Sequence, residues 1–185
     1  MADKWPKIVA RRSTKVSPWM KVIEREVEFA PNTPIQSYHA VGQSDYIGML
    51  AMTPTRRIPL VRQYRPAMEG FTWELPAGLV DAGEDAAESC KRELFEETGL
   101  TAATVQLLGT GSPCTGRMSN RIHSFFVETT SDEASHAPEA GIELKLITEA
   151  ELAAMIARGE FVSQLHLGVI ALAMTRGLLR LPARP

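Results

Sequence analysis

Hydrophobic and polar residues alternate over several short runs in the first eighty positions. In residues 20–30, charged residues separate Val22, Val27 and Phe29, and this period of two predicts a β-strand. Similar runs separated by turn residues follow at 35–41, 45–53, 57–65 and 71–78. Short runs joined by turns predict an antiparallel meander. Residues 1–18, which contain Pro6 and Pro18, read as an irregular arm.

After Gly78 the period changes to that of a helix. Ala87, Cys90 and Leu94 recur at i, i+3 and i+7 and form one apolar stripe. Asp81 with Glu84 resembles a capping box, and Gly99 is a natural C-cap. Further strands are expected at 104–110, 121–129 and 142–148, and helices at 148–159 and 162–179. We therefore predict one α+β domain over residues 35–185, preceded by an N-terminal β-rich arm over residues 1–34.

The composition is that of an ordinary globular protein, with 44% hydrophobic residues, 23% charged residues and a net charge of -2. This charge balance gives no footprint for nucleic acid or an anionic membrane. Two cysteines are too few for a disulfide framework or a structural zinc site. The N-terminus lacks the apolar stretch of a signal peptide, and no apolar segment reaches the ~20 residues of a membrane span. We expect a cytoplasmic protein without nucleic-acid or membrane partners.

Negative charge is concentrated at the end of the predicted helix, where Glu93, Glu96 and Glu97 project from one side. Like charges at spacings of three and four repel each other, and the helix dipole disfavours anions in the last turn. One interpretation is a solvated helix face. The other is a platform for a hard cation, because carboxylate oxygens are the ligands that Mg²⁺ prefers. The pattern alone leaves both open.

The spacing of the whole segment resembles the Nudix box. Nine fixed positions match: Gly78, Glu84, Arg92, Glu93, Leu94, Glu96, Glu97, Gly99 and Leu100. The resemblance implies the Nudix fold, in which mixed β-sheets are sandwiched between α-helices. It also implies hydrolysis dependent on two or three Mg²⁺ or Mn²⁺ ions. The metal ligands carried over are the carboxylates of Glu93, Glu96 and Glu97 and the backbone carbonyl of Ala77, while Glu84 and Arg92 support the geometry of the loop and helix.

Residues outside the box resemble one branch of this family, the ADP-ribose or ADP-sugar pyrophosphatases. The segment VRQYRPAMEGFTWELPAGLVD (61–81) has that branch's QxR-P sequence followed by a Glu and PAG, and GSPCTGRMSN (111–120) resembles its Ser-Pro loop. By this resemblance Arg65 contacts the diphosphate and Glu74 contacts a metal or the ribose. Pro113 borders the substrate, and Trp19 and Tyr38 stack on the nucleobase.

The resemblance implies a homodimeric enzyme that cleaves the diphosphate bond of ADP-ribose or a related nucleotide sugar. The products are a nucleoside monophosphate and a sugar phosphate. The general base is either a box glutamate, Glu96 or Glu97, or a loop glutamate. Of the two loop glutamates, Glu139 is favoured over Glu143. One alternative is another Nudix substrate, namely GDP-mannose, a dinucleoside polyphosphate or an oxidised nucleotide. Another is a Nudix-fold module that senses a nucleotide sugar without cleaving it.

Overall fold

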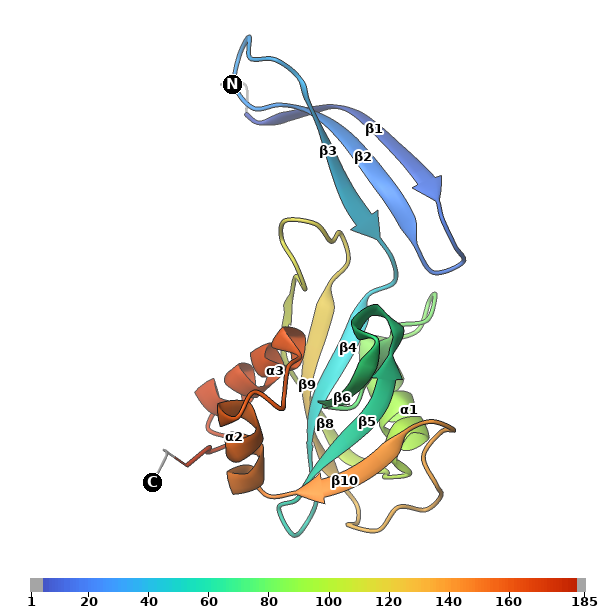
Figure 1. Ribbon diagram of the computed structural model, residues 1–185, viewed down its shortest axis with the longest axis vertical. Coiled ribbons are helices and arrows are strands. Elements are labelled where there is room, and N and C mark those ends of the chain that lie inside the picture. The colour runs from blue at the N-terminus through green and yellow to red at the C-terminus, as the bar shows by residue number, and fades with distance from the viewer. Residues whose placement is uncertain (1–4, 183–185) are drawn as a thin grey trace. The chain divides into compact units, whose positions relative to one another are not determined.

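The computed structural model describes residues 5–182, whose contacts divide the chain into two units. The first unit contains the residues up to Ser44 together with Ser112–Arg121. The second contains Asp45–Gly111 and the residues from Ile122 onward. Figure 1 labels the strands and helices of both units. Within residues 5–182, no helix is long and apolar enough to cross a lipid bilayer.

The first unit is built on a three-stranded antiparallel sheet in the order β1-β2-β3. Its strands are β1 (Lys7–Lys15), β2 (Lys21–Glu28) and β3 (Gln36–Gly42). The sequence predicted β2 and β3, but the interpretation of residues 1–18 as irregular was wrong. Most side chains of β1 are exposed, so the strand carries no one-sided hydrophobic pattern. It is held by backbone pairing with β2, supported by the ion pairs of Arg12 with Glu24 and Glu26.

The second unit contains two sheets. One has the order β7-β4-β9-β8, with β4 and β9 parallel and the other neighbours antiparallel. Its strands are β7 (Ala77–Leu79), β4 (Tyr46–Met52), β9 (Ile122–Thr129) and β8 (Ala102–Gly111). The other sheet is antiparallel in the order β10-β5-β6, with β10 (Glu143–Ile147), β5 (Ile58–Arg65) and β6 (Gly70–Glu74). A short 3₁₀ helix, η1 (Pro66–Met68), joins β5 to β6.

The predicted meander is therefore wrong between β4 and β5, which follow each other in sequence but belong to different sheets. β4 pairs instead with β9, so that Tyr46 lies opposite Ile122. A pairing between residues this far apart in the chain leaves no local signal. The predicted α+β class is confirmed.

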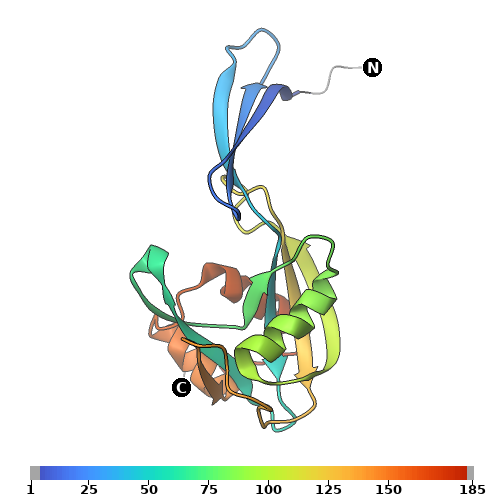
Figure 2. The ribbon, with the colours of Figure 1, turned by 90° about the vertical axis from the view of Figure 1, so that its right-hand side faces the viewer.

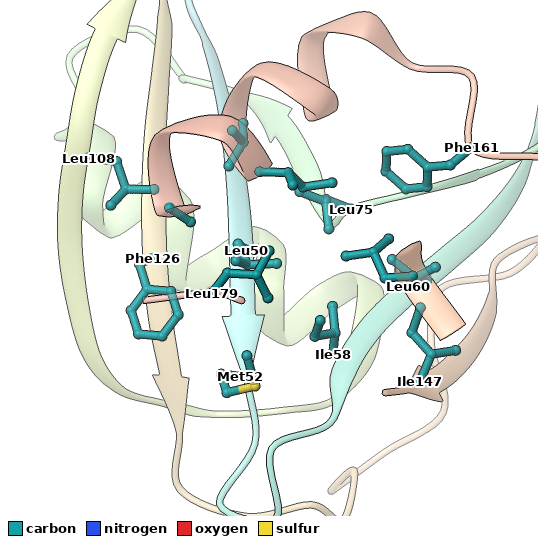
Figure 3. Close-up of a cluster of buried hydrophobic side chains, with 14 of the residues drawn as sticks. Leu50, Met52, Ile58, Leu60, Leu75, Leu108, Phe126, Ile147, Phe161 and Leu179 are labelled. Atoms are coloured by element: carbon teal, nitrogen blue, oxygen red, sulfur yellow. The ribbon is translucent and has the colours of Figure 1, made fainter. Parts of the chain in front are cut away.

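The side chains of β4 alternate between two hydrophobic clusters, as a strand buried on both faces requires. Ile47, Met49 and Ala51 pack with residues of α1 (Ala86–Thr98). Leu50 and Met52 enter the cluster that contains residues of α3 (Gln164–Thr175) and α2 (Glu149–Ala157), drawn in Figure 3. Figure 2 shows α1 lying across one face of the four-stranded sheet. The sheet is thus sandwiched between helices.

Helix α1 begins later than the sequence suggested. Its N-cap is Asp85, whose side chain accepts hydrogen bonds from the Ala87 and Glu88 N–H groups, so the expected cap at Asp81 was wrong. The C-cap at Gly99 is confirmed by its left-handed φ of 70°. Leu94 on the apolar stripe is fully buried, which contributes about 2 kcal/mol. This packing fixes how far α1 can rotate, and therefore where its acidic side points.

Candidate active site

Helix α1 presents its three clustered glutamates in different environments. The side chain of Glu93 is 15% exposed and that of Glu96 is 40% exposed, while Glu97 is buried at 5%. Glu93 and Glu97 are four residues apart, so both lie on the side of the helix that approaches β7. The acidic segment is therefore not a solvated face, because two of its three carboxylates are largely removed from water.

Arg92 compensates part of this negative charge. Its Nη1 donates to Glu93 at 2.8 Å and to Glu96 at 3.1 Å. Its Nε and Nη2 donate to the two carboxylate oxygens of Glu84 at 3.2 and 3.0 Å, and Nη2 also reaches the backbone carbonyl of Leu79. The hydrogen bonds from Arg92 and Ser89 lower the pKa of Glu84 to about 2. Arg92 thus ties the loop before α1, strand β7 and the acidic side of the helix together.

Glu97 lies deepest in the site. Its carboxylate accepts a hydrogen bond from the Ala77 N–H at 2.9 Å and from the Gln63 side-chain amide at 3.4 Å. Burial nevertheless dominates and raises the pKa of Glu97 to about 8, with the charge of Glu93 adding to the effect. Burial likewise raises the pKa of Glu93. Two neighbouring carboxyl groups with raised pKa values favour the binding of a cation, because the cation stabilises their ionised forms.

Gly78 lets β7 approach this carboxylate pair. A Cβ atom added at Gly78 would lie 2.0 Å from Cδ of Glu93 and 2.2 Å from its Oε1. A side chain at position 78 would therefore have to displace the Glu93 carboxyl group, and glycine lets this carboxyl group lie directly against β7. The neighbouring Ala77 N–H is placed on Glu97 by the same strand.

Strands β5 and β6 supply an ion pair between a half-exposed arginine and a buried glutamate. Arg65 donates from Nε and Nη2 to the two oxygens of Glu74 at 2.9 and 2.5 Å, and Thr72 also donates to Glu74 at 2.5 Å. Burial opposes ionisation of Glu74, but the hydrogen bonds from Arg65 and Thr72 outweigh it and lower its pKa. Glu74 is 6% exposed, whereas the Arg65 side chain is 40% exposed. Part of the Arg65 side chain is therefore open to solvent.

A cleft of about 330 Å³ lies beside this pair. It is bordered by Arg65 and Glu74, by strands β4 and β7, and by the first turn of α3. The lining residues from β4, β7 and α3 include Tyr46, Ala77, Gly78, Ser163 and His166. The structure thus brings together Arg65, Glu74 and Ala77, which the sequence predicted as site residues, around one cavity.

The two loop glutamates proposed as bases point to different places. The backbone N–H of Glu139 donates to the Glu96 carbonyl at 3.2 Å, which ties the loop to the last turn of α1, and the Glu139 charge contributes to the raised pKa of Glu93. Glu143 pairs with Arg62 at 2.9 Å, and its side chain is 61% exposed. Arg62 and Gln63 are neighbours on β5, so their side chains point to opposite faces of the sheet. Gln63 contacts Glu97, and Glu143, which pairs with Arg62, therefore lies on the face away from the box.

The remaining predicted substrate contacts belong to the first unit. Trp19 is 71% exposed and borders a second cleft of about 420 Å³ together with Lys15 and Lys21. The Tyr38 hydroxyl donates to the Gly116 carbonyl, and the Arg117 guanidinium lies over the Tyr38 ring at 5.2 Å. Pro113, in the same loop as Gly116, is half-buried.

Residues 44–165 match the family model of the NUDIX domain. The chain belongs to the Nudix family. The chain is 33% identical over 162 residues to the ADP-ribose pyrophosphatase of Mycobacterium tuberculosis, covering 84% of this chain and 78% of that protein. It is 30% identical over 146 residues to the ADP-ribose pyrophosphatase of Bacillus subtilis, covering 71% and 79%.

Among solved structures, the crystal structure of an ADP compounds hydrolase superposes with a TM-score of 0.76 at 18% identity, over 95% of this chain and 98% of the other. The predicted Nudix fold, the ADP-ribose pyrophosphatase-like branch and the hydrolase class are thereby confirmed. Nudix hydrolases generally use divalent metal ions, so the residues of this site should be able to hold a cation.

The Nudix box residues fit a hard cation in their chemistry. Within residues 5–182, no three His, Cys, Asp or Glu side chains already converge as a ready-made metal cage, because Arg92 holds Glu93 and Glu96 while Glu97 turns toward Ala77. All the donors are oxygens, which suits Mg²⁺ or Mn²⁺. Burial raises the pKa of both Glu93 and Glu97, and a bound cation would favour their ionised forms.

Two residues of the Nudix site were missed at the sequence level. Gln63, within the QxR segment, contacts Glu97, and its alternation with Arg65 along the strand was the available signal. His166 borders the cleft from the first turn of α3 and is 3% exposed. Its only signal was a polar ring just after a serine that begins an apolar helix.

The buried Glu97 carboxyl predicts a pH effect on stability in the metal-free protein. Its folded pKa of about 8 lies above the ordinary value of 4.5. Between those values the folded protein therefore binds more protons, and the wild type loses stability as pH rises from about 4.5 to 8. Glu97→Gln removes this loss. In EDTA, the variant should match the wild type near pH 4.5 and exceed it at pH 8 by on the order of a few kcal/mol in denaturant unfolding.

Glu88→Gln, on the exposed side of the same helix, is the matched control and should change stability by less than about 1 kcal/mol at both pH values. A difference between Glu97→Gln and the wild type that stays constant with pH would contradict the interpretation.

Proposed function

We propose that this Nudix protein hydrolyses the diphosphate bond of ADP-ribose or a related nucleotide sugar and releases a nucleoside monophosphate and a sugar phosphate. For ADP-ribose the products are AMP and ribose 5-phosphate. The observation that carries the proposal is the similarity over 84% of the chain to an ADP-ribose pyrophosphatase. It is supported by the Arg65–Glu74 pair, where a partly exposed arginine lines the cleft.

The proposed cofactor is Mg²⁺ or Mn²⁺, as two or three ions held by Glu93, Glu96, Glu97 and the Ala77 carbonyl. When bound, the ions neutralise phosphate charge and lower the pKa of a coordinated water. Arg65 adds a fixed positive charge at the oxyanions that develop on the phosphate. Arg92 and Glu84 keep the loop and helix in register. Glu74 orients Arg65 through the bidentate pair.

Glu139 is the proposed general base, taking the proton of the attacking water. Support comes from its loop, which is tied by hydrogen bonds to the end of α1, and from the influence of its charge on Glu93. Glu96 and Glu97 are the alternatives within the box. In the other unit, Trp19 and Tyr38 are the proposed nucleobase contacts and Pro113 a border of the substrate. The exposed Trp19 indole beside two lysines suits a base attached to a diphosphate.

Incubation of the purified protein with Mg²⁺ and a panel of nucleotide sugars, dinucleotides and nucleoside triphosphates tests the activity. We expect ADP-ribose to be cleaved to AMP and ribose 5-phosphate, identified by chromatography. Glu97→Gln should lower kcat by roughly a hundredfold or more, because a carboxylate expected to bind metal is lost. Glu88→Gln on the same helix, ion-paired with Lys91, should retain full activity.

Preferred cleavage of GDP-mannose, a dinucleoside polyphosphate or an oxidised nucleotide would move the enzyme to another Nudix substrate. Binding of ADP-ribose without any cleavage would instead indicate a sensing module.

The two loop glutamates provide a matched test of the base. Glu139→Gln should lower kcat by about 10²–10⁴-fold with little change in KM, as expected on removal of a general base. Glu143→Gln should stay within about twofold of the wild type, because Glu143 pairs with Arg62 on the outer side of the sheet. Equal losses in the two variants, or none in Glu139→Gln, would assign the base to the box.

We also propose that the protein is a homodimer. Its cytoplasmic location stays a prediction. The first unit exposes several large apolar side chains in or next to its strands, including Val9, Val16, Phe29 and Ile35. A second copy of the chain is the proposed cover for this surface. Analytical ultracentrifugation at micromolar concentration should give the mass of a dimer, and a single monomeric species would exclude it.

A further inference from the structure

His166 is a buried polar group for which the proposed reaction has no role. It lies in the first turn of α3, borders the cleft and is 3% exposed. Burial lowers its pKa to about 4, so the ring is neutral near pH 7 and carries one N–H. Among the described residues, its Nδ1 is fully buried and has no hydrogen-bond partner. A buried nitrogen left in this state costs about 1–3 kcal/mol, which calls for an explanation.

The group that faces this nitrogen is Glu74. Nδ1 of His166 lies 4.0 Å from Oε2 of Glu74, about 1 Å beyond a hydrogen bond. In this structure Oε2 is occupied by Nη2 of Arg65 at 2.5 Å, while Oε1 accepts from Nε of Arg65 and from Thr72. Glu74 is itself buried. The carboxylate therefore has a second potential donor 4.0 Å from the oxygen that Arg65 now binds.

A bound diphosphate would give Arg65 a second anionic partner besides Glu74. A phosphate beside the guanidinium competes with Glu74 for the same positive charge and the same N–H groups. A buried carboxylate that loses its cation is strongly destabilised unless another donor replaces it. Oε2 is the oxygen bound to Nη2 of Arg65, and it is also the oxygen that faces His166.

We propose that His166 is a positioning residue whose Nδ1–H binds Glu74 when Arg65 turns its charge to the diphosphate, so that Glu74 stays ionised and in place. This inference rests on the proposed function in one respect, the contact of Arg65 with a diphosphate. Its chemistry is the replacement of one hydrogen-bond donor by another. It requires a shift of about 1 Å, which a carboxylate achieves by rotating its terminal bond.

Calorimetric binding of inorganic pyrophosphate with Mg²⁺ tests the inference without requiring turnover. His166→Leu keeps an apolar volume but removes the donor, and it should weaken binding by about tenfold, the equivalent of one charge-assisted hydrogen bond. His166→Asn is the matched control, because its amide nitrogen is placed near the position of Nδ1. It should stay within about twofold of the wild type. Thermal unfolding checks that each variant is folded, and His166→Met takes the place of a leucine variant that does not fold.

Repeating the His166→Leu measurement in the Glu74→Gln variant separates a positioning role from a merely structural one. The substituted amide carries no charge and does not need the second donor, so His166→Leu in this background should change pyrophosphate binding by less than about twofold. Equal losses in both backgrounds would overturn the inference, as would equal losses in the leucine and asparagine variants. A wild type that binds no pyrophosphate would overturn it too, since Arg65 would then have no diphosphate to bind.

The outcome is distinguishable from that of the proposed function. A wild type that binds pyrophosphate with the predicted dependence on His166, but leaves ADP-ribose uncleaved, refutes the substrate and supports the positioning role. A wild type that cleaves ADP-ribose, while His166→Leu binds pyrophosphate as tightly as the wild type does, refutes only the positioning role.

Discussion

The hydrogen bonds of Arg92 offset the charge of three glutamates that α1 and its preceding loop bring onto one side of the helix. Without this guanidinium, Glu93 and Glu96 would repel each other in the last turns of a helix whose dipole already opposes them. The same side chain reaches the backbone of β7. The packing of Leu94 sets where the acidic side of α1 points, and this one cation then ties that side to the strand that carries Ala77.

Much of this arrangement could be predicted because it is local in sequence. The nine box positions follow one another from strand β7 through a loop and helix α1 to Leu100, and their spacing carries the geometry with it. The sheets are different, because the pairing of β4 with β9 joins distant segments. Strand β1 was missed since it buries almost nothing. The N-cap is Asp85 and not Asp81, because the Asp85 side chain accepts hydrogen bonds from the first N–H groups of the helix.

The details of the site that the sequence left open depend on strand alternation and tertiary contact. Glu139 and Glu143 differ by four positions in the chain, yet only Glu143 belongs to a strand, where pairing with Arg62 turns it away from the box. His166 lies on a helix remote in sequence from Glu74 and meets it only after α3 has packed on the sheet. Residues of this kind have no motif, because their role exists only in the folded chain.

The tight approach of Gly78 to Glu93 has a consequence for how strand β7 can vary. The space a side chain would need at position 78 is the space the carboxyl group fills, so the two positions share a single volume. Any larger residue at 78 displaces the acid rather than straining the backbone. A substitution at position 78 of the strand would therefore report on the chemistry of the helix, because it acts through the position of the Glu93 carboxyl group.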